Sequence, residues 1–298
     1  KPEVVLPFHP NGMLFEGLKG DEVVDSWTIY SVGGGALANE ASRLETPRSI
    51  YPLSTISEIK EWCYHEGKTF WEYVSDCEGP EIWDYLDTVW ETMCATIQRG
   101  LNNDGVLPGG LKVARKASTY WVKSKSYTDS LSSRAKIYAY ALATSEENAS
   151  GGTVVTAPTC GSSGVMPAVL YHLSTSRNFL RIRILRALAT AGLFGNVAKT
   201  NSSISGAEVG CQGEVGVACA MAAAAACQLF GGTPSQIEYA AEMGLEHHLG
   251  LTCDPVCGLV QVPCIERNAI AAARAFDANA YATLSDGSHM VSFDKVVE

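Results

Sequence analysis

The pattern of apolar and polar positions divides the chain near residue 55. Before that point, short runs rich in β-branched and aromatic residues alternate with turn residues, and the runs at 4–8, 13–15, 23–24 and 26–30 predict β-strands. Beyond it, apolar residues recur at three- and four-residue spacing, which indicates amphipathic helices. The helix expected over residues 81–100 has its apolar positions at Ile82, Leu86, Val89, Trp90, Met93 and Ile97.

A helix start is expected at 57–62, and five further helices are expected at 135–148, 180–194, 215–230, 235–249 and 265–282. The stretch 153–156 is expected to be extended, and a glycine-rich turn at 158–164 precedes another helix. We therefore expect a mainly α protein. An all-helical domain at 41–298 follows a short β-rich remnant of another domain and a linker, which together occupy 1–40.

The charge of the chain limits its partners. Its 298 residues carry a formal net charge of −10, so neither a nucleic acid nor an anionic membrane surface is expected as a partner, because both require a basic face. The longest apolar run, 215–227, is mostly small residues and is too short for a membrane span. No signal peptide opens the chain, so a cytoplasmic location is expected. Since the first residue is Lys1, we expect a fragment of a longer protein.

Ten cysteines are many for a chain of this length, and they raise the question of a metal site. A disulfide framework is not expected without a secretory signal, and most of these thiols are expected to be small buried apolar residues. Cysteines in loops rich in glycine or proline are better candidate ligands than Cys219 and Cys227, which lie inside an alanine-rich helix. The loop cysteines are Cys211, Cys253, Cys257 and Cys264. Their spacing leaves a metal site and ordinary packing both open, and it does not favour iron–sulfur over zinc.

Two polar segments are candidates for binding a small molecule. The turn at 156–164 joins an extended segment to a helix, so its free backbone N–H groups suit a carboxylate. An ordinary capped helix start explains the same pattern. The turn does not match a nucleotide-binding loop, because it lacks the Gly-Lys-Ser/Thr sequence of such loops. The junction at 199–208 is polar between two apolar helices, and it either lines a cavity or is a solvated loop. Three interpretations stay open for His247 and His248: they are metal ligands, they are bases, or they favour the C-terminus of a helix.

Two long motifs resemble those of a known family. They are NSSISGAEVGCQGEVG at 201–216, and EHHLGLTCDP at 246–255 running into QVPCIERNA at 261–269. Stretches at 105–109 and 147–152 are similar as well, and those at 7–12 and 30–35 resemble the end of the family's N-terminal α/β domain. Over essentially its whole length, the chain closely resembles iron–sulfur-dependent L-serine dehydratases of the single-chain bacterial type. It lacks most of that N-terminal domain and the family's C-terminal tail.

The resemblance implies a [4Fe–4S] cluster held by Cys211, Cys253 and Cys264 in the helical catalytic domain. The implied reaction converts L-serine to pyruvate and ammonium, with the cluster as Lewis acid for the leaving hydroxyl and a base for the Cα proton. Cys257 replaces what is usually a small residue, so it is not expected to be a ligand. The base is expected in the absent N-terminal domain, with His9 as the candidate within this chain. A homodimer is expected.

The two polar segments then provide the expected contacts to L-serine. Its carboxylate is expected to bind the glycine-rich turn and a cation, through Thr159, Ser162, Ser163 and Lys199. Its ammonium group is expected to bind acceptors of the junction, which are Asn201, Ser205 and Glu208. Cys160 departs from the family, because many members have asparagine at this position, so a polar role there is in question.

Two other functions stay open. A pyridoxal-phosphate dehydratase with Lys199 as the Schiff-base lysine would carry out the same conversion, although the helical architecture argues against it. A non-catalytic protein that binds a metal or an amino acid would keep a degenerate form of the same site.

Overall fold

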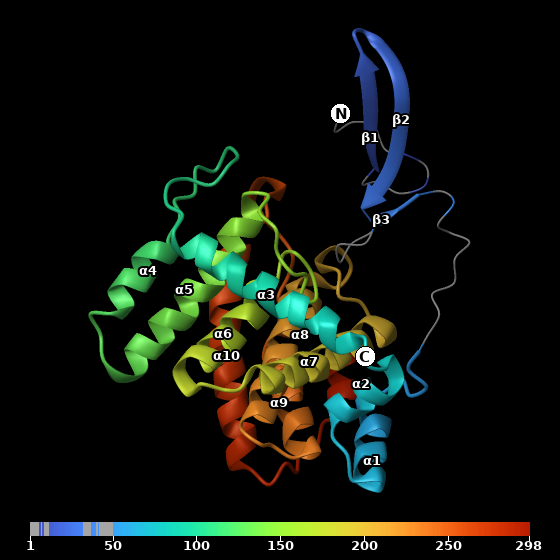
Figure 1. Cartoon of the computed structure of the whole chain (residues 1–298), viewed down its shortest axis with the longest axis vertical. Helices are drawn as coiled ribbons and strands as arrows, with labels where there is room; N and C mark the ends of the chain where they lie inside the picture. The colour runs from blue at the N-terminus through green and yellow to red at the C-terminus, as the bar shows by residue number, and fades with distance from the viewer. Residues whose placement is uncertain (1–5, 7, 9–11, 32–36, 40, 42–49) are drawn as a thin grey trace. The chain divides into compact units, whose positions relative to one another are not determined.

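The computed structural model describes residues 6, 8, 12–31, 37–39, 41 and 50–298. The chain forms two compact units, Lys1–Ile50 and Tyr51–Glu298. The first unit contains a three-stranded antiparallel sheet and the second contains helices (Figure 1). The expectation of a mainly α protein with a short β-rich segment at its start is therefore confirmed.

The sheet of the first unit has the strand order β1-β2-β3. Its strands are β1 (Gly12–Lys19), β2 (Glu22–Ser31) and β3 (Leu37–Ala38). A two-residue loop joins the first two strands, and Gly20 adopts there a φ of 65°, which glycine reaches without steric cost. The two runs expected at 23–24 and 26–30 are parts of one strand, β2. The strand expected at 4–8 falls mostly outside the described residues.

The second unit consists of eleven α-helices and one short 3-10 helix (Val256–Gly258) within its described residues. The α-helices are α1 (Ile56–Glu66), α2 (Phe70–Glu78), α3 (Ile82–Leu101), α4 (Ala117–Ser124), α5 (Asp129–Ala149), α6 (Val165–Arg177), α7 (Arg181–Asn201), α8 (Gly206–Leu229), α9 (Pro234–Glu246), α10 (Cys264–Leu284) and α11 (Phe293–Val297). Three short helices, α2, α4 and α11, were not expected from the sequence, because nine residues or fewer do not complete a recognisable apolar period. Helix α8 begins nine residues earlier than the expected 215, and this change moves Cys211 from a loop onto a helix.

Helix α8 is the centre of this unit and packs against α6, α7, α9 and α10 (Figure 1). Its alanines from Ala218 to Ala226 are fully buried, and small side chains let α9 approach so closely that a Cβ on Gly244 would lie 2.9 Å from the Ala220 Cα. Among the described residues, α8 is the helix long and apolar enough to cross a membrane. The protein buries 78% of that apolar window, as is usual for a core helix.

A buried carboxylate fixes the long connection between α3 and α4. Glu147 on α5 is 6% exposed, and its oxygens accept hydrogen bonds from Arg99 at 3.1 Å, Arg115 at 3.0 Å and Asn103 at 3.1 Å. Burial alone would raise the pKa of this carboxyl, but these donors outweigh it and hold the pKa below the ordinary 4.5. The neighbouring Glu146 accepts the backbone N–H of Lys116 at 2.7 Å, next to the start of α4.

Replacing Glu147 with glutamine is expected to lower the free energy of unfolding by about 3 kcal/mol, because the guanidinium of Arg115 then stays buried without a counter-charge. Since the folded-state pKa is depressed, the carboxylate stabilises the fold above its unfolded pKa, and this contribution disappears as the pH falls through the folded pKa. Urea unfolding below and above pH 4.5 measures both effects. The exposed Glu91→Gln, which removes a surface ion pair, is the control and should cost below about 1 kcal/mol. Equal losses in the two variants would contradict the assigned role of Glu147.

Candidate functional site

Two of the candidate cysteines are brought together by a break in helix α8. Gly210 has a φ of 76° and a ψ of 179°, and a Cβ there would lie 2.6 Å from the carbonyl oxygen of Leu251. Only glycine therefore allows the loop after α9 to reach α8. The backbone N–H of Gln212 donates to the Leu251 carbonyl at 3.1 Å, and the Gln212 side chain accepts from Gly250 at 2.8 Å. This pairing holds the loop that carries Cys253 against the turn that carries Cys211.

The resulting cluster joins thiols and one carboxylate. The Sγ atoms of Cys211 and Cys253 and a carboxylate oxygen of Glu214 all lie within 4.8 Å of one another. Cys264, the first residue of α10, borders this cluster: burial raises the pKa of its thiol to about 11, and the charges of Cys211, Glu214 and Cys253 add to the rise. All three cysteines are free thiols. Within the described part of the chain, this is the group that could hold a metal ion.

Arg267 supplies the positive charge next to these thiols. Its guanidinium lies 3.1 Å from the Cys211 Sγ, donates to the Thr252 carbonyl at 2.7 Å and approaches the Asp254 carboxylate to 3.6 Å. The thiolate is the form of cysteine that binds metals, and a cation beside it offsets the negative charge of a ligand sulfur. Arg267 was not identified from the sequence, although its position three residues after Cys264 on a helix places both side chains on one face.

Glu214 is the second functional residue that sequence reasoning missed. It follows Cys211 by three residues on α8, and its carboxylate accepts a hydrogen bond from the Thr159 hydroxyl. Burial raises the pKa of this carboxyl, while the Thr159 hydroxyl acts in the opposite direction. Two glycines leave the space that the carboxylate fills, because a Cβ on Gly161 or on Gly206 would lie 2.5 Å from one of its oxygens.

The glycine-rich turn is fixed against this cluster from two sides. Asn268 on α10 donates from Nδ2 to the Gly161 carbonyl at 2.7 Å and accepts the Gly164 N–H at 2.9 Å. Thr159 and Ser162 share a hydrogen bond between their hydroxyls at 3.0 Å. Ser163 is buried, and its hydroxyl has no partner among the residues that the structure describes. The turn, with its candidate residues Thr159, Ser162 and Ser163, therefore meets the cysteine cluster through Glu214.

The junction residues are arranged differently. Lys199 and Asn201 are exposed at the end of α7, and the Asn201 amide donates to the Ser54 carbonyl at 2.8 Å. Glu208 is exposed and accepts a hydrogen bond from the Ser203 hydroxyl. Ser205 is buried at the start of α8, directly before Gly206, whose Cβ would lie 3.3 Å from the Cys253 Sγ. Of these candidates, Ser205 is adjacent in sequence to a residue that contacts the cluster.

The remaining cysteines separate into packing residues and exposed thiols. Cys219 and Cys227 are fully buried in α8, as expected, and burial raises their pKa values to about 12 and about 11. Cys257 is exposed in the loop before α10. Cys160 is exposed as well, and both partial burial and the charge of Glu214 raise the pKa of its thiol.

His247 and His248, for which ligands, bases and helix C-terminal residues were open alternatives, lie at the end of α9. His248 is 2% exposed, contacts the Gly244 carbonyl at 2.7 Å through Nδ1, and has a pKa lowered to about 4 by burial. It is therefore a neutral packing residue at neutral pH. His247 is exposed and pairs with Glu246 at 2.8 Å. His9 lies outside the described residues.

Comparison with known proteins agrees with this arrangement. The profile of the family described as serine dehydratase alpha chain matches residues 33–298. L-serine dehydratase 1 of Escherichia coli is 46% identical over 98% of this chain and 68% of its own length. The L-serine dehydratase of Streptomyces coelicolor is 45% identical, and that of Helicobacter pylori is 37% identical over 97% of this chain and 67% of its own length. The chain belongs to the serine dehydratase alpha chain family.

Proposed function

We propose that this protein is an L-serine dehydratase, a lyase that converts L-serine to pyruvate and ammonium. One observation carries the proposal: two thiols and a carboxylate converge within 4.8 Å, beside a third thiol, in a chain whose relatives are named L-serine dehydratases. The homodimer and the cytoplasmic location expected from the sequence are part of the same proposal.

The proposed cofactor is a [4Fe–4S] cluster bound by Cys211, Cys253 and Cys264. The donor set supports this choice, because the three residues are soft thiols, none forms a disulfide, and Arg267 balances their negative charge. Three cysteines also suit a cluster with one iron that has no cysteine ligand. The chemistry that such a cluster supplies when bound is Lewis acidity toward the hydroxyl group that leaves serine.

The residues of the chain would orient the substrate. The carboxylate of serine is assigned to the glycine-rich turn, where the Ser163 hydroxyl is buried without a partner and Thr159 and Ser162 lie alongside, with Lys199 as the cation. For the ammonium group we favour Glu214 over Asn201 and Glu208, because those two side chains already hydrogen-bond to Ser54 and Ser203. Ser205 is a second acceptor. His9 remains the proposed base within this chain.

The proposal is tested by reconstituting the protein with iron and sulfide under strict anaerobiosis. The expected product is a brown, oxygen-sensitive protein that contains iron and sulfide and forms pyruvate from L-serine. A yellow protein bleached by hydroxylamine would identify a pyridoxal-phosphate enzyme instead. A colourless protein without turnover would support the non-catalytic alternative.

The substrate assignment leads to a separate prediction. Lys199→Met and Ser162→Ala are each expected to raise the KM for L-serine about tenfold, because each removes a donor to the carboxylate. Iron content should not change, since neither side chain is a proposed ligand. Steady-state kinetics and iron analysis of the loaded enzyme measure both quantities. A normal KM in both variants would mean that the carboxylate is bound elsewhere, and it would leave the cluster assignment intact.

A further inference from the structure

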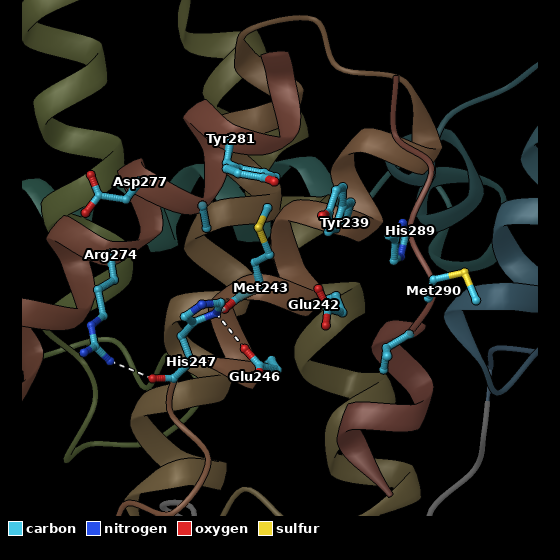
Figure 2. Close-up of a pocket in the computed structure, with 12 residues that line it drawn as sticks. Tyr239, Glu242, Met243, Glu246, His247, Arg274, Asp277, Tyr281, His289 and Met290 are labelled. Atoms are coloured by element: carbon cyan, nitrogen blue, oxygen red, sulfur yellow. Dashed lines mark hydrogen bonds and ion pairs between the residues drawn. The ribbon is translucent and has the colours of Figure 1, made fainter. Parts of the chain in front are cut away.

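A cavity of about 800 Å³ lies between α9, α10 and the segment at 289–291 (Figure 2). Neither the three candidate cysteines nor any residue assigned above to serine lines it. Its walls include the aromatic rings of Tyr239 and Tyr281 and the thioether of Met243. Its polar side chains include Glu242, Glu246, Asp277 and Arg274. The cavity is therefore a separate space with both apolar walls and charges.

Glu242 is the unusual member of this lining. It is 7% exposed, and its carboxylate points into the cavity without a hydrogen bond or ion pair to any residue that the structure describes (Figure 2). Glu238, one turn earlier on α9, shows how this fold normally satisfies a buried carboxylate. Glu238 is fully buried, and it binds Lys60 at 2.8 Å, the backbone N–H of Phe293 at 2.8 Å and His289 at 2.9 Å. Glu242 has no equivalent partners.

The other charges that line the cavity are already engaged. Glu246 pairs with His247 at 2.8 Å, and Asp277 approaches Arg134 to 3.4 Å. Arg274 donates to the His247 carbonyl at 2.7 Å. Glu242 is therefore the carboxylate left over for a ligand. Burial raises the pKa of Glu242, the imidazoles of His289 and His247 act in the opposite direction, and the carboxylates of Glu246 and Glu238 add to the rise.

The residues around Glu242 suit an organic cation better than a metal ion. A bare metal ion needs several ligands around one point, and no three His, Cys, Asp or Glu side chains described in this cavity converge closely enough. An organic ammonium group needs one carboxylate and apolar walls. Tyr239 and Tyr281 provide such walls, with ring planes at 89° and centroids 6.1 Å apart. Tyr239 is itself held in place by the stacked ring of His289 at 4.3 Å. Aromatic faces also attract organic cations directly.

We propose that this cavity binds a small primary amine, with the ammonium group on Glu242 and the apolar body against Tyr239, Tyr281 and Met243. The inference does not depend on the dehydratase activity, because it uses none of the residues of that site.

Titration calorimetry of the full chain with 2-phenylethylammonium, an aromatic ring on a primary ammonium, tests the proposal. We expect saturable binding of one molecule per chain. The neutral analogue 2-phenylethanol has nearly the same shape, and it should bind at least about tenfold more weakly, because it lacks the charge that pairs with the carboxylate.

The variants make the test specific. Glu242→Gln keeps the shape of the side chain and should weaken 2-phenylethylammonium binding at least about tenfold, while the folded state is retained because a neutral amide is easier to bury. Asp277→Asn removes the same charge from an exposed, paired position of the lining and should change affinity less than about twofold. Tyr281→Leu should weaken binding a few fold through the lost aromatic face. The proposal is overturned by an absence of saturable binding, by equal binding of the alcohol, or by equal effects of Glu242→Gln and Asp277→Asn.

Discussion

Replacing Cys253 with serine is expected to reduce serine dehydration at least about a thousandfold, because the loss of a proposed cluster ligand would remove several kcal/mol of Lewis-acid stabilisation of the leaving hydroxyl. The iron content per chain should fall with the activity. Cys253 is exposed on a loop, so the unfolding transition should remain that of the parent protein. Anaerobic iron analysis, pyruvate formation and thermal unfolding on the same samples measure the three effects together.

The chain offers a matched control for this experiment. Cys257 lies four residues further along the same loop and is exposed as well, and Cys257→Ser should change neither iron content nor activity by more than about twofold. Cys219→Ala tests a buried cysteine that is not a proposed ligand. It should lower the free energy of unfolding by about 1 kcal/mol through lost packing and leave the iron content unchanged. Loss of iron in folded Cys257→Ser protein, or its retention in Cys253→Ser, would mean that the ligand set is wrong.

Glu214→Gln is expected to lower kcat/KM for L-serine about a hundredfold. The carboxylate is proposed to bind the substrate ammonium in a half-buried site, where a charge-assisted hydrogen bond contributes both binding energy and orientation. The amide keeps the size of the side chain and still accepts the hydrogen bond from Thr159. Iron content should therefore remain that of the parent protein. Steady-state kinetics on reconstituted enzyme, normalised to iron, measures the effect.

Glu208→Gln distinguishes the two carboxylates of α8. Glu208 is exposed and bound to Ser203, so its substitution should change kcat/KM less than about threefold. If the large loss appears in Glu208→Gln and not in Glu214→Gln, the ammonium is held by Glu208. If Glu214→Gln loses its iron, Glu214 is a metal ligand and not a substrate-binding residue.

The helical architecture could be predicted from the sequence because long amphipathic helices such as α3 carry their own period. The start of α8 could not. Residues 206–214 contain three glycines and no apolar period, so this stretch was expected to precede a helix starting at 215. That error had a consequence for the site. A helix beginning at Gly206 would have placed Glu214 on the same face as Cys211, three residues away.

Other parts of the site depend on contacts between distant segments. The proximity of Cys211 and Cys253 requires the positive φ of Gly210 and the hydrogen bond from Gln212 to Leu251, neither of which follows from cysteine spacing. The family resemblance identified these cysteines, whereas local pattern did not favour iron–sulfur over zinc. Glu242 illustrates the opposite difficulty, because a glutamate on an amphipathic helix ordinarily belongs to the solvated face, and its burial depends on how α10 packs.

The break at Gly210 also determines the electric field at the cysteine cluster. Because α8 restarts there, Cys211 occupies the N-terminal end of a long helical segment, and Cys264 occupies the N-terminal end of α10. Each such end carries about half a positive elementary charge and stabilises a nearby anion by about 0.3–1 kcal/mol. Two helix dipoles and the Arg267 guanidinium thus act on the same thiols, in opposition to the burial that raises the pKa of Cys264. These positive charges lie beside the thiols in a chain whose formal net charge is −10.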